Sequence, residues 1–400
     1  MSKRLIAALL GAGALAATFL AGGVNGAQAA SPRLTHLSGL HAARACPATP
    51  AAGHATCFAK GLVNKSGAIP DATAPLSTAL APGQLQAAYA LTGKNAGGRT
   101  VAIVDAYGYP NLARDLATYR TYYGLGACTT ANTCLKIVDQ NGGSNLPRFN
   151  LGWAQEQSLD VDAVSAACPT CHILVVQAKS ANFSDLSTAV NTAAKQAGVV
   201  AISNSYGGSD LSDSTYGAAY NHSGIAITAS TGDNGYKGAS FPASSHYVTA
   251  VGGTTLKMSG TTRVTETVWS GAGSGCSSVN VAVAPSSFNT GCATRAMADV
   301  SAAADPNTGG LSTVPPSSSK NSSWAQWGGT SESSPIIAAV YALAGGGYSN
   351  TTPYTNGTSA NLHDITSGSN GSCPTTQWCT ARAGWDGPTG LGTPNGTGAF

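Results

Sequence analysis

The sequence contains few charged residues. Asp, Glu, Lys and Arg make up 9% of its 400 residues, far below the quarter that is usual in soluble proteins. The formal net charge of +3 is small and the basic residues are scattered, which argues against a nucleic-acid partner or an anionic membrane surface. Few charges also mean little change in net charge on acidification, so the composition suits an exported protein exposed to varied pH.

Long apolar runs are absent beyond the N-terminal region. Residues 1–30 have the basic residues Lys3 and Arg4 near their start, continue with an apolar stretch from Leu5 to Leu20, and end in an A-x-A type cleavage site before Ser31. This is the organisation of a secretory signal peptide. No later stretch is long and apolar enough to cross a bilayer. We therefore expect a secreted, extracellular protein that has no membrane association once the signal peptide is removed.

The ten cysteines fall into five close pairs. An even number, short spacing and export together favour disulfides. The C-x-x-C segment at 168–171 has no second C-x-x-C near it, so a zinc site is disfavoured there. The expected disulfides join Cys46 to Cys57, Cys128 to Cys134, Cys168 to Cys171, Cys276 to Cys292, and Cys373 to Cys379.

A serine at the start of an apolar helix is the first candidate for catalysis. Residues 328–335 read GGTSESSP and precede an apolar run from Ile336 to Leu343, so a buried helix should begin close to Ser331. Free N–H groups in its first turn would favour developing negative charge, as serine peptidases of the subtilisin clan require. The usual base is a histidine, but none here stands in the His-Gly-Thr-His context of a subtilisin. The seven histidines are His36, His41, His54, His172, His222, His246 and His363.

Carboxylates offer a different base. Glu156 and Asp160 are four residues apart, so they share one face of a predicted helix, and no Lys or Arg lies between Phe149 and Ala178. Such a pair titrates as a unit and can share a proton, although most pairs of this kind form a solvated acidic face. Asp233 follows the apolar run from Gly224 to Thr228. It therefore lies at the carboxyl end of a predicted strand, where open α/β sheets build their sites.

The order and contexts of these four residues resemble those of the sedolisins, the serine-carboxyl peptidases, and most closely the secreted actinobacterial members. The resemblance extends from about Pro82 to the C-terminus and includes the motifs E-x-x-x-D, S-x-G-D-x-G and G-T-S-x-x-x-P. It implies that Ser331 is the nucleophile and Glu156 the general base. It also implies that Asp160 orients Glu156 and that Asp233 is the oxyanion partner.

These roles imply an acid-acting peptidase. A carboxylate base stays partly ionised well below the reference pKa of histidine, about 6.5, whereas an aspartic acid must keep its proton to donate to an oxyanion. We expect a monomer that hydrolyses peptides or proteins, and both endopeptidase and tripeptidyl-peptidase action are open. Two alternatives remain: a secreted, non-catalytic binding protein on a peptidase fold, and a subtilisin-type peptidase that uses Asp105 and a histidine.

The sequence allows two interpretations of the role of Asp105. It ends the apolar run Val101–Val104, which predicts a buried parallel strand. Sedolisins tend to have a glutamate at this place, joined to the catalytic hydrogen-bond network. Asp105 is therefore either a member of that network or an acid that caps the turn after the strand.

A calcium site is predicted near the C-terminus. Asp364 and Asp386 lie on glycine-rich, irregular backbone. Carboxylates there suit Ca²⁺, which also takes carbonyl ligands, although such acids are more often turn formers. Sedolisins hold one calcium ion with D-I-T and G-W-D motifs at matching spacing. The resemblance implies that the ligands are the carboxylates of Asp364 and Asp386 and the carbonyls of Ile365, Arg382 and Gly384; Arg382 stands where the family commonly has glycine.

Alternating strands and helices predict the fold class, α/β, with a subtilisin-like, mostly parallel central sheet and helices on both faces. The expected parts are a signal peptide at 1–30, a short N-terminal pro-segment or arm at 31–81, and a peptidase domain at 82–400. Residues 31–81 show no clear periodicity, and they are too few for the long folded propeptide of most sedolisin precursors. The expected strands are Arg99–Asp105, His172–Val176, Val199–Asn204, Ile225–Ser230 and Tyr247–Val251, and the expected helices are Asn111–Tyr123, Gln155–Ala167, Ser184–Ala197 and Ser331–Ala344.

Overall fold

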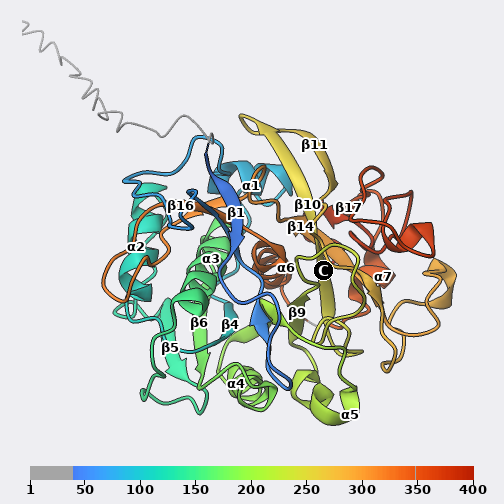
Figure 1. Cartoon of the computed structure of the whole chain (residues 1–400), viewed down its shortest axis with the longest axis horizontal. Helices are drawn as coiled ribbons and strands as arrows, with labels where there is room; N and C mark the ends of the chain where they lie inside the picture. Colours follow the sequence, from blue (N-terminus) through green and yellow to red (C-terminus); the bar gives the residue numbers. More distant parts are fainter. Residues whose placement is uncertain (1–38, 347) are drawn as a thin grey trace, which may run out of the picture. The chain divides into compact units, whose positions relative to one another are not determined.

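A central sheet of eight strands organises the protein. The computed structural model describes residues 39–346 and 348–400, so the signal peptide predicted at 1–30 lies outside the described residues. The strand order is β11-β10-β9-β7-β4-β6-β5, with β14 also paired to β10 (Figure 1). All neighbours pair in parallel except β10 and β11. The strands are β4 (Thr100–Ala106), β5 (Leu135–Asp139), β6 (His172–Ala178), β7 (Val199–Asn204), β9 (Ala226–Ser230), β10 (Thr249–Ser259), β11 (Thr262–Val268) and β14 (Val300–Ala303).

Helices cover both faces of this sheet, which confirms the predicted fold class. Successive side chains of a strand point to opposite faces, so Val101 and Ile103 of β4 join one apolar cluster and Ala102 and Val104 the other. Helices α3 and α6 pack together in the first cluster, whereas α4 packs on β4 and β6 in the second. The helices are α1 (Pro82–Ala88), α2 (Leu112–Tyr122), α3 (Leu151–Ala167), α4 (Phe183–Ala194), α5 (Asp213–Tyr216), α6 (Thr330–Ala344) and α7 (Thr352–Asn356).

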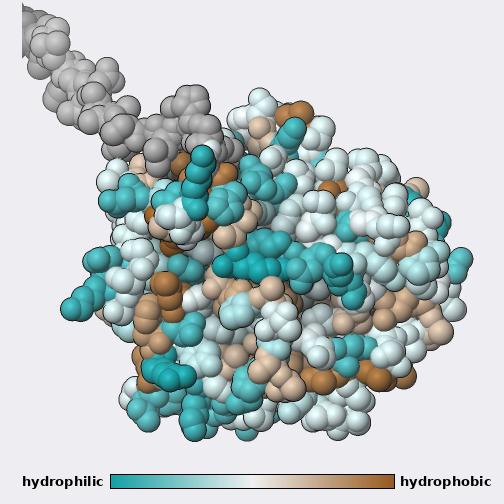
Figure 2. Space-filling view, in the orientation of Figure 1, coloured by the Kyte–Doolittle hydropathy of each residue, from teal (hydrophilic) through white to brown (hydrophobic). Residues whose placement is uncertain are grey.

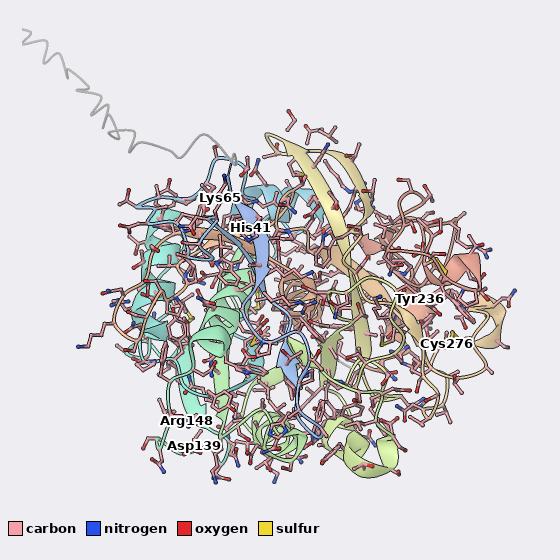
Figure 3. All side chains as sticks on the ribbon, in the orientation of Figure 1. His41, Lys65, Asp139, Arg148, Tyr236 and Cys276 are labelled. Carbon is pink, nitrogen blue, oxygen red and sulfur yellow. A yellow bond between two sulfur atoms is a disulfide. The ribbon has the colours of Figure 1, made fainter. Side chains whose placement is uncertain are left out.

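The N-terminal segment adds three short strands that the sequence did not predict. β1 (His41–Arg44) pairs with β3 (Lys60–Val63), and β2 (Thr56–Cys57) pairs with β8 (Tyr206–Gly207). The segment, blue in Figure 1, crosses the front of the molecule, and His41 marks the start of β1 in Figure 3. β3 also pairs with β16. The remaining strands are β12 (Gly275–Cys276), β13 (Ala296–Met297), β15 (Leu311–Thr313), β16 (Ala325–Gly328), β17 (Leu362–His363) and β18 (Thr393–Pro394).

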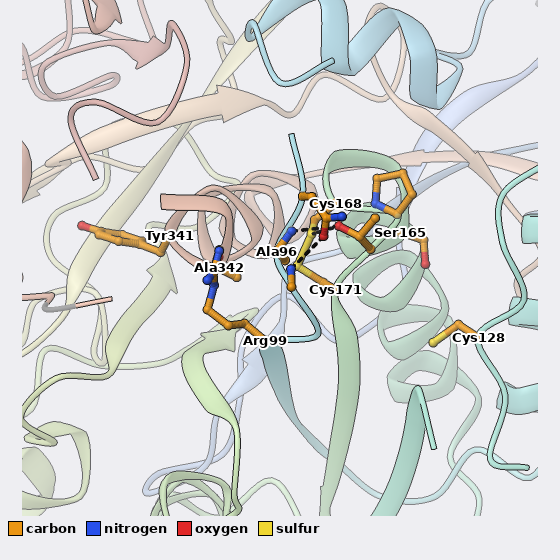
Figure 4. Close-up of a disulfide and its surroundings, with 12 residues drawn as sticks. Ala96, Arg99, Cys128, Ser165, Cys168, Cys171, Tyr341 and Ala342 are labelled. Carbon is orange, nitrogen blue, oxygen red and sulfur yellow. Dashed lines mark hydrogen bonds between the residues drawn. A yellow bond between two sulfur atoms is a disulfide. The ribbon is translucent and has the colours of Figure 1, made fainter. Parts of the chain in front are cut away.

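The sequence predicted most element boundaries to within a few residues. The strand Val199–Asn204 has the expected bounds, but α3 begins four residues before the expected Gln155, at Leu151. The reason is an N-cap: the side chain of Asn150 accepts a hydrogen bond from the N–H of Trp153 at 3.2 Å. All five expected disulfides are present. Figure 4 shows the Cys168–Cys171 disulfide directly after α3.

The surface agrees with the low charge of the sequence. Weakly polar to hydrophilic residues cover most of the face in Figure 2, and the apolar patches on it are small and separate. Within the described part of the chain, no helix is long and apolar enough to cross a membrane.

A buried ion pair ties β10 to the C-terminal region. Arg295 donates to the two carboxylate oxygens of Asp299 at 2.6 and 2.5 Å, and both side chains are fully buried. Asp299 also accepts from the N–H of Ala250 at 2.7 Å and from the hydroxyl of Tyr354 at 2.6 Å. These bonds compensate both charges, so removing one partner would leave the other buried and unpaired.

We expect Asp299→Ala to reduce the free energy of unfolding by about 3–5 kcal/mol, because Arg295 would stay buried without its counter-ion. Equilibrium denaturant unfolding measures the loss. Lys136→Ala changes an exposed cation and serves as the control, with an expected change within about 0.5 kcal/mol. Equal stability of the two variants would contradict this role of the ion pair.

Candidate active site

Ser331 lies in the first turn of α6 and is fully buried. The chain enters this helix from β16 through Gly329, whose φ of 108° lies in the left-handed region that favours glycine. The hydroxyl of Ser331 donates to the carbonyl oxygen of Ser205 at 3.4 Å. Because the first N–H groups of a helix have no partner within it, negative charge that develops beside Ser331 would be stabilised.

Glu156 and Asp160 lie on α3, which packs against α6. Both side chains are fully buried. The alternative interpretation from the sequence, that the two acids form a solvated face of the helix, is therefore wrong. The hydroxyl of Ser205 donates to Oδ1 of Asp160 at 2.9 Å and thereby links Asp160 to Ser331. The N–H of Ala59 donates to Oε2 of Glu156 at 2.7 Å. The structure therefore brings the serine and the two carboxyl groups together.

Burial controls the protonation of this cluster. It raises the pKa of Glu156 and of Asp160 well above the usual values, and the charge of Asp105 raises both further. The nearby hydroxyl of Ser331 and the N–H of Ala59 oppose the rise in the pKa of Glu156. The carboxyl groups thus hold protons more tightly than in water and, because they interact, titrate as a unit.

Asp105 is part of the same electrostatic group. Burial raises the pKa of Asp105 to about 8. Neither of its carboxyl oxygens has a hydrogen-bond partner within residues 39–346 and 348–400, so it does not cap the turn after β4. Of the two interpretations of Asp105, its position favours membership of the carboxyl cluster.

Asp233 lies on the loop after β9, against the start of α6. Its Oδ1 accepts from the N–H and the hydroxyl of Thr330 at 2.8 and 2.9 Å, whereas Oδ2 has no partner among the described residues. Burial raises the pKa of Asp233, and the nearby charge of Lys60 opposes that rise. A proton on Oδ2 would therefore be available for a group bound beside the helix N-terminus.

Within residues 39–346 and 348–400, no histidine belongs to this cluster. Among the described residues, none hydrogen-bonds to Ser331, Glu156, Asp160 or Asp233; His222, for example, contacts the carbonyl oxygen of Ala219 at 3.0 Å. Sequence reasoning missed two contributors, Ser205 and the N-terminal segment with Ala59. The segment 203–207, which reads SNSYG where a predicted strand ends, carried a signal for Ser205, whereas no periodic pattern pointed to the N-terminal segment.

The candidate calcium ligands also lie close together. The N–H of Gly384 donates to Oδ2 of Asp364 at 2.9 Å, and the N–H of Arg382 donates to Oδ2 of Asp386 at 3.3 Å. Burial raises the pKa of Asp386 to about 7, and the charge of Asp364 contributes. The described residues contain no group of three or more His, Cys, Asp or Glu side chains suited to a metal. A site here would therefore depend on two carboxylates and backbone carbonyls such as that of Ile365.

Comparisons with known proteins agree with this fold. A model described as the subtilase family covers residues 145–383. Kumamolisin from Bacillus sp. (strain MN-32) is 30% identical over 366 residues, which cover 80% of this chain and 62% of that protein. Pseudomonas sedolisin, a serine-carboxyl proteinase solved with two molecules of pseudo-iodotyrostatin, is 24% identical with a TM-score of 0.64 over 82% of this chain and 96% of its own. The S41 psychrophilic protease is 17% identical with a TM-score of 0.53, over 80% and 99% of the two chains.

The buried carboxyl cluster predicts how stability depends on pH. Asp105 binds its proton more tightly in the folded state, with a pKa of about 8, than in the unfolded chain. Its contribution to stability is therefore complete below the unfolded pKa and is lost as the pH rises toward 8. We expect the melting temperature to fall between about pH 4 and pH 8, and Asp105→Asn to reduce that fall.

Asp139→Asn is the matched control, because backbone N–H groups lower the pKa of Asp139, which is partly exposed. The contribution of Asp139 to stability therefore increases with pH, whereas that of Asp105 decreases. Differential scanning calorimetry across this pH range makes the comparison. A melting temperature that rises steadily to pH 8 in the wild type would contradict the burial of neutral carboxyl groups.

Proposed function

The chain belongs to the subtilase family, and from this premise we propose that it is a secreted, acid-acting serine-carboxyl peptidase of the sedolisin type. The observation that carries the proposal is the burial of Ser331 beside Glu156 and Asp160, with no histidine near it in the described part of the chain. The chain spans 62% of the length of kumamolisin. Residues 1–30 would be the signal peptide and residues 31–81 a short pro-segment.

In the proposed reaction, Ser331 attacks the carbonyl carbon of a peptide bond while Glu156 takes the hydroxyl proton. Asp233, protonated at Oδ2, and the N–H groups at the start of α6 stabilise the oxyanion. Glu156 then gives its proton to the leaving nitrogen, the C–N bond breaks and an acyl-enzyme remains. Water attacks this ester, Glu156 again serves as base, and Ser331 is released. Asp160 holds the second proton of the pair.

The two alternatives have less support. A subtilisin-type mechanism requires a histidine next to Ser331, and the described residues supply none. A non-catalytic binding protein would have no reason to keep a complete set of catalytic groups. Here all four catalytic candidates are present and buried. Asp160 accepts a hydrogen bond from Ser205, and Asp233 accepts one from Thr330 at the start of the helix that carries Ser331.

We also propose one structural calcium ion at the C-terminal loops. Asp364 and Asp386 converge on the backbone of residues 382–384, and hard oxygen donors of this kind suit Ca²⁺. The ligands would be both carboxylates with the carbonyls of Ile365, Arg382 and Gly384. None of these residues belongs to the catalytic group, so the ion would stabilise the fold rather than take part in the reaction.

We expect Ser331→Ala, Glu156→Gln and Asp160→Asn to fold normally but to lose peptidase activity, because nucleophile and base act as a unit. Hydrolysis of a peptide library at acid pH measures this. Asp162→Asn is the matched control, since Asp162 is a buried carboxyl on the same helix with a raised pKa. Near-normal turnover by Glu156→Gln would rule out a serine–glutamate mechanism.

Asp233→Asn should retain more activity than Asp233→Ala, because an amide N–H can still donate to the oxyanion. Removing one such donor typically costs about 100- to 1000-fold in kcat, which is the loss expected for the alanine variant. Steady-state kinetics on one peptide compares the three proteins. An alanine variant as active as the wild type would exclude Asp233 from the oxyanion site.

Chelation should lower the melting temperature before it affects catalysis, because an ion that binds only the folded state stabilises it by about 2.7 kcal/mol at a hundredfold excess over Kd. Asp386→Asn should have the same effect, whereas Asp71→Asn, at an exposed position, should have none. Thermal unfolding with elemental analysis tests this. A melting temperature unaffected by chelator, in a protein without calcium, would refute the site.

A further inference from the structure

A cavity of about 230 Å³ lies beside the candidate active site. It is lined by Gly232 and by Asp233, the proposed oxyanion partner, and also by Gly207. Gly207 comes two residues after Ser205, whose carbonyl oxygen accepts the hydrogen bond of Ser331. A peptide residue whose carbonyl group is attacked must place that group against Asp233, so its side chain lies within reach of this cavity.

The cavity has room for a side chain because glycines line it. A Cβ added to Gly207 would lie 2.7 Å from the ring atom Cζ of Phe58, and one added to Gly232 would lie 3.5 Å from it. The ring therefore uses the space that these two glycines leave free, and the cavity continues beyond it. A substrate side chain that enters the cavity takes the place of this ring.

The charges around the cavity are mostly positive. The chain has only 20 lysine and arginine residues, and three of them gather here. Lys237 lines the cavity, Lys60 donates from Nζ to the carbonyl oxygen of Asp233 at 2.5 Å, and Arg44 bonds to the side chain of Asn234. Among the described residues that line the cavity, Asp233 has the only carboxyl group, and the proposed mechanism requires it to be protonated. An anionic side chain is therefore favoured here.

Lys237 is the cation that is free to bind a substrate. It follows Tyr236, which is labelled in Figure 3, and its side chain is exposed. Within residues 39–346 and 348–400 it has no hydrogen bond and no ion pair, whereas Lys60 and Arg44 are already bonded. A Cβ added to the neighbouring Gly238 would meet no atom within 4 Å, so the lysine stands beside open space.

We propose that Lys237 makes the enzyme select peptides with glutamate or aspartate at the residue whose carbonyl group Ser331 attacks. The proposal rests on the peptidase function proposed above. An ionised substrate carboxylate pairs with the ammonium group of Lys237 and meets no repulsion from a protonated Asp233. A lysine or arginine at the same position meets a cation instead, and like charges placed together disfavour binding.

This selectivity should depend on the ionisation of the substrate itself. The reference pKa of glutamate is about 4.3, whereas lysine stays charged throughout the acid range. The ratio of kcat/KM for a glutamate peptide to that for the matched glutamine peptide should rise about two- to fivefold between about pH 3 and pH 6, the size expected of an exposed ion pair. The titration of Asp233 affects both peptides and cancels in the ratio. Because the ion pair is present before and during the reaction, the gain should lie in KM rather than in kcat.

Steady-state kinetics of the secreted protein on this peptide pair, with mass spectrometry to identify the cleaved bond, makes the test. Lys237→Gln should give the same ratio at every pH, and Lys237→Glu should favour a lysine peptide over the glutamine peptide. Both variants should fold, because the side chain is exposed. Lys94→Gln changes an exposed lysine that does not line the cavity and should keep the wild-type ratio. A glutamate moved two positions upstream in the peptide should confer no such advantage.

Equal cleavage of the glutamate and glutamine peptides by the wild type across this pH range would overturn the proposal and leave the peptidase assignment standing. A preference for glutamate that persists in Lys237→Gln would also overturn it, because the selection would then come from other groups. A folded wild type that hydrolyses none of the peptides would overturn the peptidase assignment and this proposal together.

Discussion

The packing of α3 against α6 is the contact on which the site depends. It places Glu156 and Asp160 next to the first turn of the helix that carries Ser331, with Ser205 between them as a hydrogen-bonding link. Burial of two carboxyl groups with so few partners is unfavourable when they are ionised. The same burial raises the pKa of both. The contact that assembles the cluster therefore also determines the pH at which it carries charge.

This constraint connects the site to the composition of the whole chain. Few charged residues mean that acidification changes the net charge little. Burial raises the pKa of several acids, Asp105 and Asp233 among them. Acid then protonates groups whose folded environment prefers the proton, which stabilises rather than disrupts the fold. The burial of unpaired carboxyl groups is therefore expected to make the fold tolerant of acid.

The sequence predicted those parts of the structure that local patterns specify. The apolar runs gave the central strands, the four-residue spacing gave the shared face of Glu156 and Asp160, and the short cysteine spacings gave the disulfides. The N-terminal segment was not predictable in this way, since β2 is two residues long and its partner β8 is about 150 positions away along the chain. The choice between the two interpretations of Asp105 also could not be made from the sequence, because it depends on the surroundings of the side chain. Only the structure shows that its carboxyl oxygens lack hydrogen-bond partners among the described residues.

The pH dependence of kcat/KM on one peptide tests the central claim most directly. A carboxylate base and a protonated aspartic acid at the oxyanion site predict a bell-shaped profile with its maximum at acid pH and a fall toward neutrality. A profile that rises through a single apparent pKa of about 6.5 to a plateau at neutral or alkaline pH is typical of a histidine base. That result would contradict the account.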